Sequence, residues 1–232
     1  MTLEFAARYF LMPNKLKYLK NKESEESVKT EKKLFDYCCS KGNDEKSDKD
    51  IEQLLMQYSA ITMYLQLIAD KNDKSVLDKE VLEAYWIGNQ LLDSITSEDM
   101  KTHFAEHLGR VNTPKETIQE IISNIPQNAK PHHAFHVLHI KAMMKDDKIM
   151  FANFPKCKID HGKVVQVKER SLIVEKNSQR KEVEIDHSFL KNIKIGDLIT
   201  HHWNFAIDKI TEEQAEQLHL HTEKQRNVME FS

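Results

Sequence analysis

The sequence contains few of the residues that interrupt regular structure and few that cross-link a chain. Only five glycines and five prolines occur in 232 residues, so each one is a specific signal for a turn or a helix end. There are three cysteines, and two of them, Cys38 and Cys39, are neighbours. An odd count with adjacent members makes a poor disulfide framework. We therefore expect reduced thiols and a cytoplasmic protein.

Long apolar runs and a strong excess of one charge are also missing. No run approaches the roughly 20 apolar residues that span a bilayer, and the first residues lack the basic segment and apolar core of a signal peptide. The net charge is −3, which gives no electrostatic reason to expect binding to nucleic acid or to an anionic membrane. Phosphate-binding glycine loops, a Gly-x-Ser-x-Gly motif and a Cys-x-x-Cys pair are absent. We expect neither a nucleic-acid partner nor a membrane partner.

Apolar residues in the first two thirds of the chain recur at three- and four-residue steps, the pattern of amphipathic helices. The clearest run, from Ile51 to Ile68, predicts one helix, and further helices are predicted from Ser75 and from near Ser97. Gly88 falls inside the helix predicted from Ser75, where a glycine usually indicates close packing or a ligand near the backbone. Residues 1–150 are therefore predicted to form an all-helical domain.

Short segments rich in β-branched residues replace this pattern after Asp147. They are residues 163–168, 172–175, 181–186, 198–203 and 205–210. Five short strands within about 60 residues predict a small closed barrel, and Thr211 with Gln214 predicts the start of a terminal helix. The predicted fold class is α+β multidomain, with an all-α domain over residues 1–150. A small OB-like β-barrel with a C-terminal helix follows over residues 151–232.

Thiol and imidazole side chains collect in two short segments of the predicted barrel. Cys157 and His161 are separated by three residues, and His202 comes from another strand. A thiolate with imidazoles suits Fe(II), Zn or Cu. His201 precedes His202, and because neighbours in a strand face opposite ways, at most one of the two should point at such a site. The alternative is a small buried cysteine with histidines on the surface.

A second cluster follows a proline, in the sequence Pro131-His132-His133-Ala-Phe-His136-Val-Leu-His139. On a helix His132 and His136 lie four apart on one face, and two imidazoles at that step can hold one metal. The positive end of the helix dipole favours neutral imidazoles there. The same histidines could instead pack and cap helices at a domain interface, and the sequence leaves both possibilities open.

Residues 157–218 resemble the HypC family of hydrogenase maturation chaperones. The resemblance rests on Cys157 followed by Gly162-Lys-Val-Val165, on Lys194-Ile-Gly-Asp197, on His202 with Phe205-Ala-Ile207, and on the acidic helix from Thr211. It implies an OB-like barrel that carries iron with diatomic ligands between maturation proteins and the hydrogenase large-subunit precursor. It also implies that Cys157 and His202 are the iron ligands.

The chain departs from the family pattern around its cysteine. The family's cysteine becomes the N-terminal residue, whereas Cys157 is internal and has no adjacent α-amino group. His161 stands where the family has proline, and His201 is additional. The helical region is not part of the small chaperone. With Glu83-Ala-Tyr-Trp-Ile-Gly-Asn89 and the histidine tract, it is similar to an uncharacterised prokaryotic family.

Three functions are compatible with these residues. The candidate metal ligands are Cys157, His202, His161, His132 and His136. The first function is an accessory protein for metallocentre assembly, not an enzyme, that holds metal through Cys157 and His202. Its cargo would be iron, with zinc as the alternative. The second is a metal-dependent enzyme with its site between the two domains, acting on a one-carbon or diatomic species. The third is a binding module whose metal site has lapsed.

Overall fold

The computed structural model describes residues 2–15, 25–40, 45–143 and 157–230 of the chain. The chain forms two compact units: unit 1 joins Met1–Tyr58 to Ile159–Ala215, and unit 2 joins Ser59–Lys158 to Glu216–Ser232. The domain boundary predicted at residue 150 lies outside the described residues. The units divide the chain differently from that boundary, because the first helices group with the barrel.

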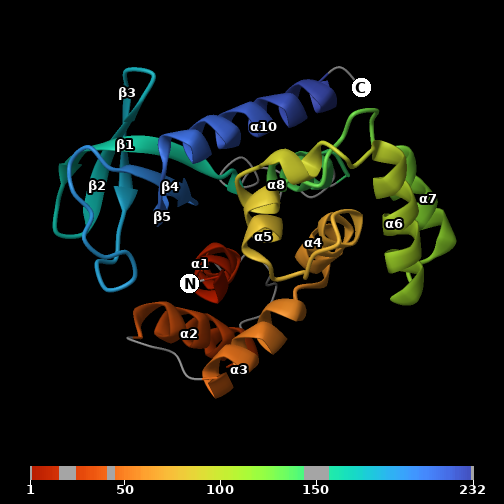
Figure 1. Ribbon diagram of the computed structural model, residues 1–232, viewed down its shortest axis with the longest axis horizontal. Helices are drawn as coiled ribbons and strands as arrows, with labels where there is room; N and C mark the ends of the chain where they lie inside the picture. Colours follow the sequence, from red (N-terminus) through yellow and green to blue (C-terminus); the bar gives the residue numbers. More distant parts are fainter. Residues whose placement is uncertain (1, 16–24, 41–44, 144–156, 231–232) are drawn as a thin grey trace. The chain divides into compact units, whose positions relative to one another are not determined.

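Unit 1 is built around a closed barrel of five strands (Figure 1). These are β1 (Asp160–Val167), β2 (Ser171–Lys176), β3 (Gln179–Glu184), β4 (Leu198–His202) and β5 (Phe205–Ile210). Neighbours follow the order β1-β2-β3-β5-β4, and they pair antiparallel except for a short parallel contact between β3 and β5. All five predicted strands are confirmed, and so is the α+β fold class.

A glycine allows β1 and β2 to approach closely. A Cβ at Gly162 would lie 3.0 Å from the Cβ of Val174 on β2, a distance that real side chains rarely tolerate. Val164 and Val174, with Leu172 and Ile199, are almost fully buried in the barrel. The Gly-Lys-Val-Val segment is therefore a packing element of the barrel, since its glycine and its first valine both serve the contact between strands.

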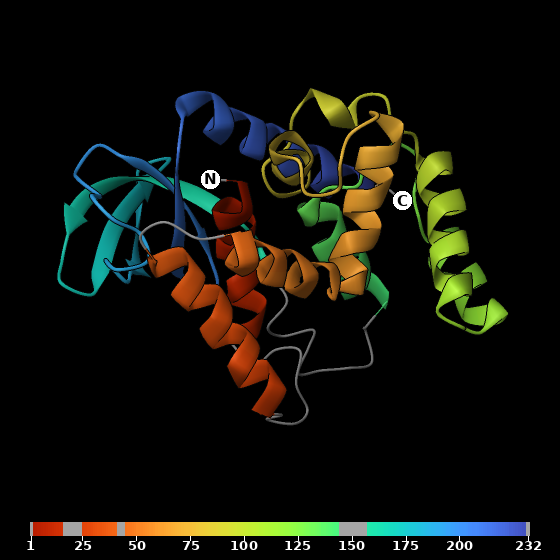
Figure 2. The same cartoon turned by 60° about the horizontal axis from the view of Figure 1, so that its bottom comes forward.

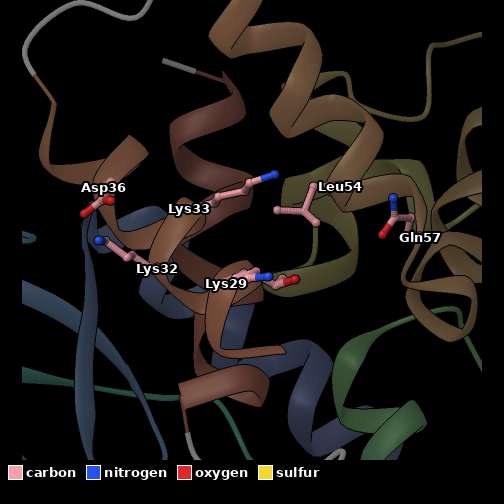
Figure 3. Close-up of a pocket in the computed structure, with 7 residues that line it drawn as sticks. Lys29, Lys32, Lys33, Asp36, Leu54 and Gln57 are labelled. Carbon is pink, nitrogen blue, oxygen red and sulfur yellow. The ribbon is translucent and has the colours of Figure 1, made fainter. Parts of the chain in front are cut away.

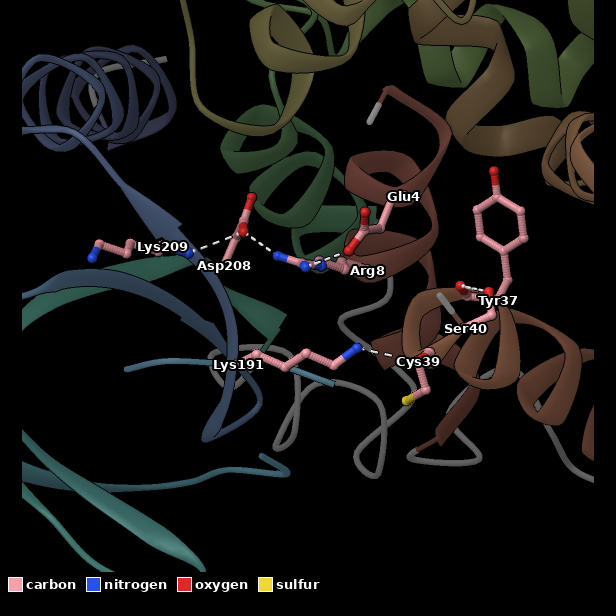
Figure 4. A network of polar contacts seen from close by, with 8 residues as sticks. All are labelled: Glu4, Arg8, Tyr37, Cys39, Ser40, Lys191, Asp208 and Lys209. Atoms are coloured by element: carbon pink, nitrogen blue, oxygen red, sulfur yellow. Dashed lines mark hydrogen bonds and ion pairs between the residues drawn. The ribbon is translucent and has the colours of Figure 1, made fainter. Parts of the chain in front are cut away.

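Three helices complete unit 1: α1 (Thr2–Lys15), α2 (Glu25–Cys39) and α3 (Glu45–Met56). Arg8 of α1 donates hydrogen bonds to Asp208 of β5 and, at 2.5 Å, to Glu4 (Figure 4). Burial works against the charge of Arg8, but Asp208 and Glu4 outweigh it and raise the pKa of the guanidinium. A second contact joins Tyr9 Oη to Thr200 Oγ1 of β4 at 3.0 Å. Helix α1 is thus fixed to the barrel by buried polar contacts.

Unit 2 is helical. It contains α4 (Ser59–Lys71), α5 (Lys79–Trp86), the 3-10 turn η1 (Gln90–Leu92), α6 (Ser97–Arg110), α7 (Lys115–Ser123), α8 (His133–Met143) and most of α10 (Glu212–Glu230). Helices α6 and α7 lie side by side in both views (Figure 1 and Figure 2). The core is aromatic: the ring of Tyr64 lies 5.5 Å from that of Tyr85 and 4.9 Å from that of Phe104. In the described part of the chain, no helix combines the length and apolarity needed to cross a membrane.

The single helix predicted over residues 51–68 was wrong. Helix α3 ends at Met56 and α4 begins at Ser59. The amide of Tyr58 bonds to the carbonyl of Leu55, three residues back, at 3.2 Å, so the last turn tightens and the helix ends. The apolar spacing could not reveal this break, because it continues in three- and four-residue steps on both sides of it.

Gly88 was also misplaced by the sequence pattern, which put it inside a helix. Helix α5 ends at Trp86, and Gly88 follows with a φ of +99°, a conformation that L side chains rarely adopt. A Cβ at this position would lie 2.3 Å from Cδ2 of His221 on α10. The expected close packing is therefore confirmed, although in a turn and not in a helix.

Candidate metal centre

His202 ends strand β4 and is fully buried. Its strand partner is Phe205 of β5, and the connecting residues Trp203 and Asn204 both have positive φ, 52° and 68°. Two positive φ values in a two-residue loop are typical of the type I′ hairpin turn, which matches the twist of the strands. A tryptophan is unusual there. The tight turn fixes the backbone of His202 at the end of the barrel strands.

His201 is buried as well, although neighbours in a regular strand face opposite sides. The register between β4 and β5 shifts between Thr200 and His201, which is the irregularity of a β-bulge. Burial, followed by the charge of Lys181, lowers the pKa of His201 to about 4. His201 is therefore a neutral imidazole beside a lysine, and that positive charge disfavours a cation at its ring.

His161 lies in a polar cluster on β1. Its Nδ1 is 3.5 Å from Nζ of Lys176, and the same ammonium donates to Oδ1 of Asp160 at 2.6 Å. Asp160 is paired with His201 across β1 and β4. The ring nitrogen of His161 that faces this cluster accepts from an ammonium and is not open to a metal in this geometry. Its predicted role as a metal ligand stays a prediction.

Cys157 and His133 come together within unit 2. A ligand nitrogen of His133 and the Sγ of Cys157 lie within 4.8 Å of each other. His133 begins helix α8 and is buried, whereas Cys157 is half-buried and precedes the first barrel strand. None of the three cysteines, all of them described, forms a disulfide, as expected. The pair offers one soft and one borderline ligand atom, the set that transition metals bind.

Two aromatic side chains of α5 pack against the His133 ring of this pair. The His133 ring lies 4.9 Å from the ring of Trp86 and 5.9 Å, edge to face, from that of Tyr85. The hydroxyl of Tyr85 is fully buried and has no hydrogen-bond partner among the described residues. Burial raises the pKa of Tyr85 well above its usual value, and the charges of Tyr64 and Cys157 act in the same direction. The phenol of Tyr85 therefore stays protonated beside the ring of His133.

The predicted pair His132 and His136 meets different neighbours. His132 caps α8, because its Nδ1 accepts a hydrogen bond from the amide of Ala134 at 3.1 Å, and its ring stacks 5.8 Å from that of His221. Burial, and then the charge of His221, lowers the pKa of His132 to about 3. His136 places its ring edge to face with Tyr64 at 5.1 Å. A metal shared by His132 and His136 stays a prediction.

The covalent chain ties Cys157 to the end of β4. Asp160 follows Cys157 by three positions, and its partner in the β1–β4 register is His201. Three residues span at most about 11 Å when fully extended. Cys157 is therefore only a short way along the chain from Asp160, the residue that pairs with the neighbour of His202.

The pocket between α2 and α3 has a different character (Figure 3). It is lined by Lys29, Lys32 and Lys33, with Asp36, Leu54 and Gln57 around them. The lysine amines point in different directions, and protonated amines donate hydrogen bonds but offer no lone pair to a metal. Three lysines around a single carboxylate, Asp36, therefore do not favour a metal in this pocket.

Sequence reasoning missed His133. It chose the i, i+4 pair His132 and His136 within the histidine tract and passed over His133, whose ring stacks 6.4 Å from that of His136. The signal that could have found it is its position directly after the helix-capping His132, where α8 begins. Its proximity to Cys157 depends on the tertiary fold.

Two family models match parts of the chain. The HupF/HypC family model matches residues 161–220, which confirms the resemblance of the barrel, although the match begins four residues after Cys157. The model described as a family of unknown function (DUF6390) matches residues 2–182, which confirms the resemblance of the helical region to an uncharacterised family. No curated protein and no solved structure matches. Because the second model spans well over half of the sequence, the chain belongs to the family of unknown function DUF6390.

Proposed function

We propose that this chain is an accessory protein for metallocentre assembly, of the hydrogenase-maturation type. Its barrel would hold iron, or an iron–ligand fragment, through Cys157 and His202, and iron would be its cargo. The observation that carries this proposal is the HupF/HypC match over the barrel. The closed five-stranded barrel followed by α10 agrees with the fold that the resemblance implies.

The chemistry of the two side chains supports a metal-carrying role. A thiolate and an imidazole are a donor set that Fe(II) accepts, and zinc is the alternative. A metal stabilises the thiolate form of a cysteine and releases its proton. His202 is fully buried at the end of β4, so its imidazole is held in one place. Two protein ligands would leave coordination positions for diatomic ligands and for the ligands of a receiving protein.

The partners that follow from this function are metallocentre maturation proteins and a hydrogenase large-subunit precursor. We propose that the protein works in the cytoplasm, where thiols stay reduced and Cys157 remains available. A nucleic-acid partner has no support, because the net charge of −3 offers no electrostatic attraction to phosphates.

The test is anaerobic purification of the full chain, expressed together with hydrogenase maturation proteins, with measurement of iron content and infrared spectra. We expect bound iron with cyanide and carbonyl bands. Both signals should disappear in Cys157→Ser and in His202→Gln. Cys39→Ser is the matched control for the thiol, because Cys39 is also half-buried, and His219→Gln is the control for the imidazole, because His219 is exposed.

Thermal unfolding of each variant separates loss of metal from loss of fold, which matters for the buried His202. Wild-type protein that stays free of metal after iron loading under reducing conditions would rule out the proposal. Bound metal without the infrared bands, but with dependence on Cys157, would instead favour the metal-dependent enzyme.

A further inference from the structure

We propose that His133 is a further ligand of the metal held by Cys157, so that the helical region completes the centre. This inference rests on the proposed function, because it requires a metal at Cys157. Both residues belong to unit 2, and their ligand atoms lie within 4.8 Å of each other. In this arrangement the helical region contributes a ligand to the metal site.

The distance fits a shared metal after a small adjustment. With a metal–sulfur bond of about 2.3 Å and a metal–nitrogen bond of about 2.0 Å, tetrahedral ligands lie roughly 3.5 Å apart. A pair within 4.8 Å therefore needs to close by little more than an ångström. Cys157 is half-buried, and rotation of its side chain can supply that movement. His133 is held more firmly.

The imidazole of His133 is preorganised by its neighbours. It is buried, and its ring packs on Trp86 at 4.9 Å with an angle of 36° and against Tyr85 at 89°. A ligand whose orientation is fixed before the metal arrives loses little freedom on binding. The contacts with Trp86 and Tyr85 of α5 thus give His133 the rigidity that metal ligands need.

Tyr85 supplies an independent observation that points to a ligand. Its hydroxyl is fully buried without a hydrogen-bond partner in the described part of the chain, and a buried hydroxyl left unpaired costs about 1–3 kcal/mol. The ring of Tyr85 lies 5.9 Å, edge to face, from the ring of His133, so this phenol belongs to the surroundings of the proposed ligand. A small ligand on the metal, or the thiolate itself, would accept a hydrogen bond from this hydroxyl. We assign Tyr85 as a positioning residue of the centre.

The experiment uses the full-length protein under anaerobic conditions, titrated with Fe(II) or Co(II) alone, and X-ray absorption spectroscopy to count sulfur and imidazole ligands. We expect one sulfur and two imidazoles in the wild type, from Cys157, His202 and His133. His133→Gln should lose one imidazole and bind at least about 10-fold more weakly. Tyr85→Phe should also weaken binding about 10-fold, the size seen for outer-shell contacts, without changing the ligand count.

His107→Gln is the matched control, because His107 is a half-buried histidine of the same unit. His133→Cys adds a rescue: binding should return with two sulfurs and one imidazole, a result that a merely structural role would not produce. A wild-type centre with a single imidazole would overturn the inference, whatever the stability of the variants. So would wild-type affinity and ligand count in His133→Gln while Cys157→Ser fails to bind. Metal binding that Cys157→Ser leaves unchanged would instead overturn the proposed function.

Discussion

The two compact units accommodate buried polar groups in different ways. In unit 1 charge is paired with charge: Arg8 bonds to Asp208, and the buried Asp197 accepts from Nζ of Lys209 at 2.7 Å. Burial works to raise the pKa of Asp197, but Lys209 and nearby backbone and lysine contacts outweigh it and lower the pKa. These pairs satisfy one another within the unit.

Unit 2 buries neutral groups instead. His132 and His221 stack on each other, and burial lowers the pKa of both. Polar atoms without a hydrogen-bond partner in the described residues include Tyr85 Oη, His221 Nδ1 and Gln225 Nε2. Buried polar atoms normally have partners. Unit 1 therefore holds its buried charges in pairs, with the neutral His201 and the proposed ligand His202 as exceptions at the end of β4. Unit 2 holds neutral groups that a ligand or ordered water would complete.

The largest effect should come from breaking the charge pairing of unit 1. Arg8→Ala leaves the carboxylate of Asp208, which is only 16% exposed, without its guanidinium partner, and removal of one partner from a buried pair costs about 3–5 kcal/mol of unfolding free energy. Urea unfolding followed by circular dichroism measures it. Arg110→Ala is the control, since Arg110 and its partner Glu106 are exposed and 3.7 Å apart, and such pairs contribute at most about 1 kcal/mol. Equal losses in the two variants would show that the contact between α1 and β5 is not structural.

A smaller effect is expected from the contact that brings α5 to α10 in unit 2. Gly88→Ala combines an unfavourable positive φ with a Cβ 2.3 Å from His221, and we expect a loss of about 2–4 kcal/mol. The matched variant is Gly109→Ala, because Gly109 lies in α6 with no heavy atom within 4 Å of the added Cβ. That change should stabilise the helix by up to about 1 kcal/mol. Thermal melts of the two proteins should therefore shift in opposite directions, and a Gly88→Ala protein as stable as wild type would contradict the observed packing.

The elements of the barrel could be predicted from the sequence because their signals are local. Residues 181–186 alternate with period two, and Gly162 and Gly196 mark a close strand contact and a turn with φ of +95°. Local patterns failed where the outcome depended on tertiary contacts. The break after Met56 left the apolar spacing intact. Gly88 was placed inside a helix because the contact that requires a glycine there is with the ring of His221, which comes from far along the chain.

The residues of the candidate site also fall into those that a local sequence signal identifies and those that only tertiary packing brings in. Cys157 and His202 stand out in the sequence through a motif and its spacing. The neighbourhood of His133 depends on how α5, α8 and the segment of Cys157 pack, which no local pattern encodes. The spacing of His161 from Cys157 also suggested a ligand, and this stays a prediction; the β1–β2 contact sets its Nδ1 3.5 Å from Nζ of Lys176. Spacing along the chain identifies which groups are available, and the packing of the helices decides which of them meet.

The smallest expected effect is a dependence of stability on pH that comes from the neutral imidazole of His221. Burial, with the charges of Lys224 and Lys130, lowers its pKa to about 4 although Asp93 opposes this. The unfolded chain takes up a proton near pH 6.5 and the folded chain only near pH 4, so this stability is complete above pH 6.5 and is lost as the pH falls towards 4. At pH 5 the loss should be about 2 kcal/mol relative to neutral pH.

Unfolding free energies of the wild type and of His221→Gln, measured between pH 7 and pH 4.5, test this dependence. The variant should lose stability less steeply in acid, whereas His219→Gln, which changes an exposed histidine on the same helix, should follow the wild type. Part of the slope should persist in His221→Gln, because burial also lowers the pKa values of His132 and His201. An unchanged slope in His221→Gln would mean that folding does not lower the pKa of this ring, and the assignment of a neutral, buried imidazole to α10 of unit 2 would then fail.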